Sequence, residues 1–116
     1  MSSLREMKIV PIQANSTLLN EAEIKKLSAE LAHWDVIQVD GEKRLQRKYP
    51  FKDFSQALSF SVQVGGIAEA ENHHPSILTE WGSVTVTWWT HNVKGLHQND
   101  FIMAARTDHL YEQRQT

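Results

Sequence analysis

Three of the six histidines in this 116-residue chain lie in two short stretches whose residue types suit proton transfer. His73 and His74 directly precede Pro75, and His91 follows a strand-like run. Imidazole both donates and accepts protons near neutral pH, so clustered histidines indicate general acid–base chemistry. Pro75 disfavours helical backbone at His74, so we expect a helix to end at Asn72 and a stiff loop to display the two rings.

Two other interpretations of these histidines are open from residue types alone. A metal site is one, because His73, His74, His91 and either Glu69 or Glu71 are permitted zinc ligands. The spacing argues against it, because neighbours in an extended segment point apart and no His-x-His or His-x-x-x-His pair is present. Inert, hydrogen-bonded histidine is the other, and we apply it to the remaining three: His33, His97 and His109. For the clustered histidines we favour proton transfer without a metal.

The composition excludes several other classes of function. The chain has no cysteine, and therefore no disulfide, thiolate nucleophile or cysteine-ligated metal. A net charge of −2, from 12 basic and 14 acidic side chains, provides no basic footprint for nucleic acid. No serine lies in a Gly-x-Ser-x-Gly elbow, and no glycine loop has phosphate-binding spacing. No apolar run could cross a bilayer and no signal-peptide layout is present, so we expect a cytoplasmic protein without membrane association.

Local patterns predict an α+β fold, a four-stranded antiparallel sheet with three helices packed on one face. Asn20 with Glu23 forms a capping-box pattern at the first helix, and Asp40-Gly41 is a strong hairpin turn. Alternation from Val84 indicates a strand that points His91 away from the helix-packed core. The elements are expected as helices over 21–31, 54–72 and 100–113 and strands over 34–39, 42–51, 77–81 and 84–91.

A single domain is expected over residues 17–116, preceded by an N-terminal extension over residues 1–16. Residues 7–12 are predicted to form an edge strand or to drape over the core, because Pro11 confines a strand to an edge. The helix over 54–72 is apolar over much of its girth and contains Gly65-Gly66. Such a helix usually contacts more than its own sheet, so we predict that it forms a subunit contact.

Taken as a group, these residues closely resemble the pterin-4a-carbinolamine dehydratase family. The resemblance rests on Glu-x-x-x-His-His-Pro at 69–75, Val-x-Val-x-Trp-x-Thr-His at 84–91, and Gly95-Leu96 with Asp100. It also includes Trp34, residues 49–54 and the Ala104-Ala105 pair, and covers the chain from Leu18 to Leu110. Residues 78–91 are most similar to the bacterial branch that accompanies phenylalanine hydroxylase.

The resemblance implies a lyase that dehydrates 4a-hydroxytetrahydrobiopterin to quinonoid dihydropterin and water, without metal or organic cofactor. This reaction recycles the pterin cofactor of aromatic amino acid hydroxylation. By matching position, His73, His74 and His91 are the expected catalytic residues. We expect His73 and His91 to be the acid–base pair, with their individual roles open, and His74 to position the ring. The positions that line or support the substrate site are Asn72, Thr90, Glu69, Trp34 and Asp100.

Two residues depart from the family pattern. Asn72 stands where animal members carry aspartate, so any charge role there is lost. His97 stands where serine or threonine commonly caps the third helix, so that cap, and not the chemistry, is in question. The resemblance also implies a homodimer or homotetramer built through the helix over 54–72, and a functional link to phenylalanine hydroxylase. The alternative function is a non-catalytic dimerisation, regulatory or assembly-factor module, which would use the same helix and would not need the histidines.

Overall fold

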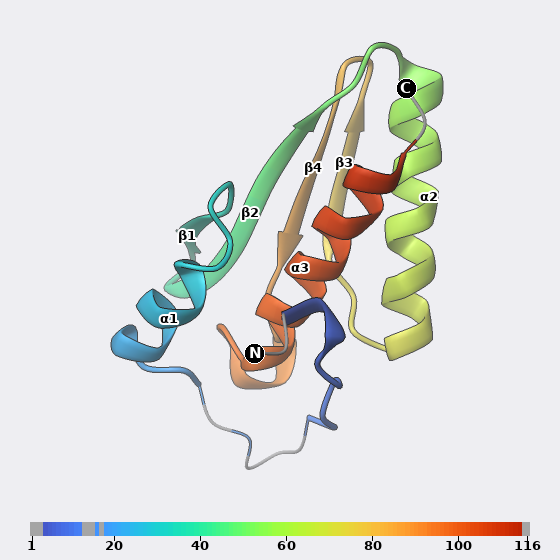
Figure 1. The fold of residues 1–116 in the computed structure, drawn as a ribbon. Helices are drawn as coiled ribbons and strands as arrows, with labels where there is room; N and C mark the ends of the chain where they lie inside the picture. The colour runs from blue at the N-terminus through green and yellow to red at the C-terminus, as the bar shows by residue number, and fades with distance from the viewer. Residues whose placement is uncertain (1–3, 13–15, 17, 115–116) are drawn as a thin grey trace.

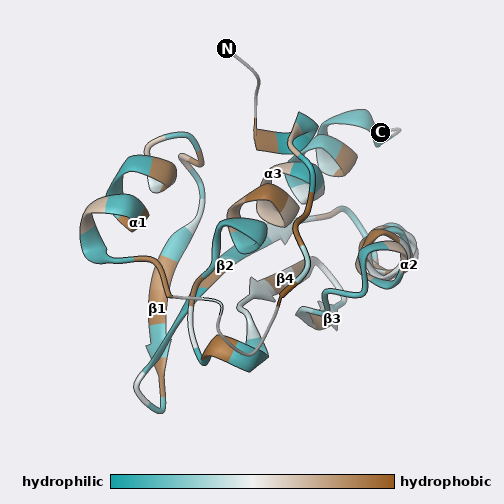
Figure 2. Cartoon of the chain, turned by 90° about the horizontal axis from the view of Figure 1, so that it is seen from below, coloured by the Kyte–Doolittle hydropathy of each residue, from teal (hydrophilic) through white to brown (hydrophobic). Residues whose placement is uncertain are grey.

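The computed structural model describes residues 4–12, 16 and 18–114, which form a four-stranded antiparallel sheet with helices on one face (Figures 1 and 2). The strand order is β1-β2-β4-β3, with β1 and β3 at the edges. The strands are β1 (Asp35–Val39), β2 (Glu42–Pro50), β3 (Ser76–Glu80) and β4 (Ser83–Trp88). The helices are α1 (Glu21–Ser28), α2 (Phe54–Glu71) and α3 (Gln98–Gln113), with short 3₁₀ helices η1 (Leu4–Glu6) and η2 (His91–Val93). The predicted α+β fold is confirmed.

The hairpin between β1 and β2 turns where the sequence predicted it. Asp40 and Gly41 have φ of 52° and 81°, the positive values that a two-residue type I′ turn needs. Val39 pairs with Glu42, and on the other side of β2, Leu45 pairs with Trp88. The central strands β2 and β4 therefore carry the wall on which the helices pack.

The core lies between this wall and helices α2 and α3. Val84, Val86 and Trp88 alternate along β4 and are fully buried. Because side chains alternate across a strand, burial of this set fixes the register of β4 against its neighbours. The helices fill the space above with apolar residues that include Ala57, Phe60, Val64, Ala68, Phe101, Ile102 and Ala104.

Side-chain caps begin the helices and a left-handed residue ends α2. Asn20 and Glu23 form the predicted capping box at α1, with bonds of 2.8 and 2.9 Å. Asp53 accepts the Gln56 N–H at the start of α2. Asn72 caps the other end with φ 53° and ψ 41°, a conformation that asparagine tolerates better than most residues. The predicted end of this helix is confirmed.

Three local expectations are corrected. Helix α3 begins at Gln98, two residues before the predicted Asp100, because His97 caps it. Strand β3 is Ser76–Glu80, one residue earlier than predicted, and α1 ends at Ser28 instead of 31. Of the two alternatives predicted for residues 7–12, the structure shows the second: they form no strand and drape over the first part of α3.

Candidate active site

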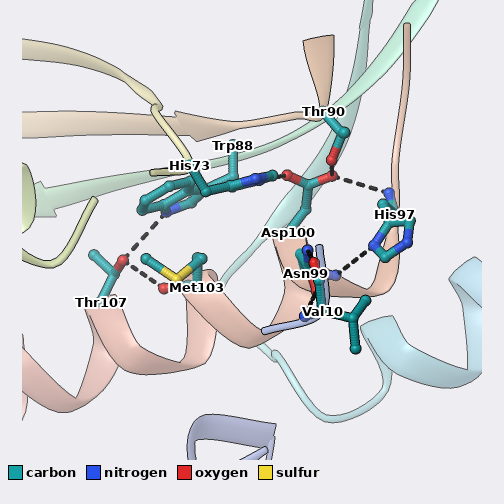
Figure 3. A network of polar contacts seen from close by, with 9 residues as sticks. All are labelled: Val10, His73, Trp88, Thr90, His97, Asn99, Asp100, Met103 and Thr107. Atoms are coloured by element: carbon teal, nitrogen blue, oxygen red, sulfur yellow. Dashed lines mark hydrogen bonds and ion pairs between the residues drawn. The ribbon is translucent and has the colours of Figure 1, made fainter. Parts of the chain in front are cut away.

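His73 is held at the end of α2 by backbone and ring contacts. The left-handed turn at Asn72 lets the His73 amide donate to the Ala68 carbonyl at 3.1 Å. The imidazole stacks on the indole of Trp88, with ring centres 5.8 Å apart and planes 17° apart. Trp88 is itself anchored, because its Nε1–H donates to Thr107 Oγ1 at 3.2 Å (Figure 3). The ring of His73 is therefore positioned from two sides before any substrate binds.

Asp100 joins His73 to β4 and to α3 in one buried network (Figure 3). Its Oδ1 lies 2.6 Å from His73 Nε2. Its Oδ2 accepts the Thr90 hydroxyl at 2.7 Å and the His97 backbone N–H at 2.9 Å. Asp100 is 0% exposed and Thr90 is 3% exposed, so these bonds are shielded from competing water. Sequence reasoning named all of these residues, but not the bonds that join them.

The network determines which nitrogen of His73 is available for chemistry. A buried carboxylate with donors on both oxygens is an acceptor, so His73 donates from Nε2–H to Asp100. The ring then has only Nδ1 to offer to a substrate. The same logic holds a catalytic histidine in one tautomer in hydrolase triads. A neutral His73 imidazole held in this way carries its free lone pair on Nδ1.

The other two predicted catalytic histidines lie at the surface beside this network. His74 is exposed, and its Nε2 lies 3.3 Å from Glu69 Oε2. His91 directly follows Thr90 and begins η2, and its ring packs 4.6 Å from that of Trp89. Within the part of the chain that the structure describes, no hydrogen bond or ring contact joins the three imidazoles to one another. A ligand would have to span the space between them.

A pocket of about 360 Å³ opens beside His73. This volume lies within the about 300–1,000 Å³ that small-molecule sites occupy. The residues that line it are Ile9, Val10, Pro11, Ile12, Glu71, Asn72, His73, Asn92 and Asn99. The lining therefore combines an imidazole, a carboxylate and amide side chains with the apolar side chains of residues 9–12.

Trp34, expected near the substrate, lies in a different cluster. Its Nε1–H donates to Asp108 Oδ1 at 3.0 Å, and the same oxygen accepts Tyr49 and Arg47, each at 2.6 Å. Asp108 is eight residues beyond Asp100 on α3, roughly 12 Å along the helix axis. Burial first, and then the charge and hydrogen bond of Asp108, raise the pKa of Tyr49 far above its usual range. Trp34 is thus buried in a network that is separate from the one around His73.

The cap that the sequence left in question is made by His97 itself. Its Nδ1 accepts the Asn99 N–H at 3.0 Å, and Asp100 accepts the His97 N–H, which completes a capping box. Burial lowers the pKa of His97, and the proximity of His73 lowers it further, although the Asp100 charge opposes both. A neutral ring is required here, because a protonated Nδ1 could not accept a hydrogen bond.

Among residues 4–12, 16 and 18–114, no three histidine, aspartate or glutamate side chains are grouped as ligands of a metal ion. Over the same ranges, no helix is both long and apolar enough to span a bilayer.

Comparison with known proteins defines the class to which this fold and site correspond. The model of the family described as pterin 4 alpha carbinolamine dehydratase matches residues 17–110, and the chain belongs to this family. A Microcystis aeruginosa protein with the provisional name pterin-4-alpha-carbinolamine dehydratase is 50% identical over 114 residues, which cover 98% of each chain. A Chlorobium limicola protein with the same provisional name is 52% identical over 112 residues, covering 97% of this chain and 99% of that one.

Two solved structures share the fold. A transcriptional coactivator/pterin dehydratase from Brucella melitensis has a TM-score of 0.72 and 33% identity, covering 80% of this chain and 97% of that one. A pterin dehydratase-like protein identified as a RuBisCO assembly factor in the alpha-carboxysome has a TM-score of 0.57 and 22% identity, covering 66% and 87%. The second likeness concerns the fold alone.

Proposed function

We propose that this protein is a 4a-hydroxytetrahydropterin dehydratase that acts by histidine general acid–base catalysis. The observation that carries the proposal is the buried bond of 2.6 Å between His73 Nε2 and Asp100, in a histidine that also lines the pocket. Membership of the pterin carbinolamine dehydratase family supports the choice of substrate. The reaction would recycle the pterin cofactor of aromatic amino acid hydroxylation.

The chemistry needs one group to take a proton and one to give a proton. Loss of water from the carbinolamine removes the proton from N5 and the hydroxyl from C4a, and a C4a=N5 double bond forms. In our proposal a neutral imidazole accepts the N5 proton while an imidazolium protonates the departing hydroxyl, so that water leaves. His73 and His91 are the proposed pair, and His74, Asn72 and Thr90 position the ring.

The decay of chemically generated carbinolamine, followed by ultraviolet absorbance, tests this proposal. We expect His73→Ala to lower kcat about 100-fold or more and His91→Ala to lower it in a smaller step, since general acid–base help is worth about 10²–10⁴-fold. His33→Ala is the matched control, because His33 is an exposed histidine outside the site. The assignment is wrong if both active-site variants dehydrate the substrate at the rate of the unaltered protein.

We also propose that the protein works as a homo-oligomer whose subunits meet along α2. Phe54, Leu58 and Val62 recur every four residues on this helix and are 45%, 48% and 68% exposed. An apolar stripe of this kind is unusual on a free surface. A side chain added at Gly65 or Gly66 would meet nothing within 4 Å in the single chain, which leaves room for a partner's atoms. Sedimentation as a monomer at micromolar concentration would refute this.

The second candidate is a binding module that does not use the histidines. The observation that favours it is the same exposed stripe on α2, together with the Brucella melitensis structure, which is named both as a coactivator and as a dehydratase. Pull-down from the native host separates the two candidates. A partner retained equally by His73→Ala and by the unaltered protein supports the module. A neighbouring gene for phenylalanine hydroxylase would support the recycling role.

A further inference from the structure

The N-terminal segment lies outside the residues that the family model matches but forms part of the candidate pocket. The family model begins at residue 17, whereas residues 9–12 line the pocket beside His73. We call residues 4–12 the strap. It runs beside α3 in Figure 1, where its blue trace lies in front of the orange helix. The Microcystis aeruginosa relative aligns over 98% of this chain, so this length is not peculiar to one sequence.

Two side chains of α3 hold the backbone of the strap. Arg106 donates from Nε to the Arg5 carbonyl at 3.2 Å and from Nη2 to the Met7 carbonyl at 2.7 Å. Asn99, seven residues earlier on the helix, binds Val10 at both of its backbone groups. Residues seven apart lie on one face of an α-helix, so these two side chains form a row along which the strap is fixed.

The side-chain amide of Asn99 forms a pair of hydrogen bonds with the backbone of Val10. Its Oδ1 accepts the Val10 N–H at 3.1 Å, and its Nδ2 donates to the Val10 carbonyl at 2.7 Å. Only an amide side chain offers a donor and an acceptor in this arrangement. Asn99 is 1% exposed, so the pair of bonds is protected from water. The strap is thereby placed at a set distance from the helix.

The same turn of α3 also positions the catalytic network. Asp100, the residue after Asn99, is the acceptor for His73. One peptide unit therefore links the group that orients His73 to the group that holds the pocket wall formed by residues 9–12. Ile9 and Ile12 are half-buried in that wall, and Pro11 stiffens it.

We propose that the strap is a substrate-binding wall and that Asn99 is its positioning residue, so that together they set the affinity for the pterin. This rests on the proposed function for the identity of the ligand. A pocket lined by both apolar side chains and polar groups suits a flat heterocycle, which hydrogen-bonds at its edges and packs by its faces. His73, Asp100 and Thr90 are untouched by the strap's bonds, so the wall affects binding and not proton transfer.

The test separates binding from chemistry. Asn99→Ala removes both bonds from the helix side, and Val10→Pro removes the N–H from the strap side at an exposed position. We expect each to raise KM for the carbinolamine, and Kd for stable 7,8-dihydrobiopterin by calorimetry, about fivefold, with kcat within twofold. The double variant should raise KM and Kd no further than the single variant with the larger effect, because both substitutions remove the same bonds. Lys8→Ala, in the strap but outside the pocket lining, is the control and should change neither constant.

Different results would refute the strap proposal and the proposed dehydratase function. Unchanged KM and Kd in both variants would overturn the strap proposal, as would a fall in kcat at constant KM, which would mean that Asn99 acts only through Asp100. Failure of the unaltered protein to dehydrate the substrate while it still binds dihydrobiopterin would refute the proposed function. In that case the Kd values of the variants for 7,8-dihydrobiopterin would alone decide whether the strap forms a wall of the binding site.

Discussion

Replacement of Asp100 by asparagine tests the central physical argument. The carboxylate accepts three hydrogen bonds of 2.6, 2.7 and 2.9 Å, from His73, Thr90 and the His97 N–H. In Asp100→Asn, the amide oxygen must remain where two donors already converge, because a fixed backbone N–H cannot accept a bond. The amide nitrogen then faces His73 Nε2 and donates to it. The His73 proton is displaced to Nδ1, which then has no lone pair to offer to a substrate.

The size of the effect follows from this change of tautomer. General acid–base help from a correctly oriented histidine is worth about 10²–10⁴-fold, so we expect kcat to fall about 100-fold, which corresponds to about 2.7 kcal/mol of activation free energy. The lower end of the range applies because His74 and His91 remain. Stability should fall by only about 1–2 kcal/mol, since the amide keeps the geometry and loses mainly the charge.

Stopped-flow ultraviolet absorbance, corrected for uncatalysed loss of water, measures the rate. Asp108→Asn is the matched control. Asp108 also accepts three donors, but its cluster with Trp34 is roughly 12 Å along α3, so this variant should lose stability by about 2 kcal/mol and keep its kcat. If Asp100→Asn folds and retains kcat within twofold, the inference that Asp100 sets the tautomer of His73 is refuted.

Three further predictions concern stability and assembly. Burial lowers the pKa of His97, so the folded state favours the neutral ring. The neutral His97 ring therefore stabilises the fold above the unfolded pKa of about 6.5, and this stabilisation is lost as the pH falls below that value. His97→Ser keeps a capping oxygen without a titrating group, and its thermal midpoint should fall less between pH 7.5 and 5 than that of the unaltered protein; equal falls would contradict this. Asn72→Ala should cost about 1 kcal/mol in urea unfolding because of its positive φ, whereas Asn72→Gly should cost little; equal losses would exclude backbone strain as the cause. Val62→Glu should dissociate the oligomer in sedimentation without lowering the thermal midpoint of the single chain, since this side chain is 68% exposed there; an unchanged sedimentation coefficient would exclude α2 as the contact.

Most of the architecture was predictable because its signals are local. The Asn20 capping box, the Asp40-Gly41 turn and the end of α2 at Asn72 each depend on bonds between residues at most four apart, and each was identified from the sequence. Alternation in β4 predicted that Val84, Val86 and Trp88 share one buried face, but not that Ser83 and Thr87 on the other face are buried too. The start of α3 was missed because histidine is an uncommon cap, and its Nδ1 bond to Asn99 is visible only in three dimensions.

The sequence by itself determined the elements, the loop that displays His73 and His74, and the residue types of the candidate site. Only the tertiary structure decided which partners those residues take. The order β1-β2-β4-β3 brings the end of β4 to the start of α3, so that Asp100 binds both Thr90 and His73, which lies 27 residues earlier in the chain. Trp34 was assigned to the site from the resemblance, and only the fold shows that its Nε1–H donates to Asp108 Oδ1. Partners distant in the chain are selected by the packing of helices on the sheet, and local periodicity carries no information about that selection.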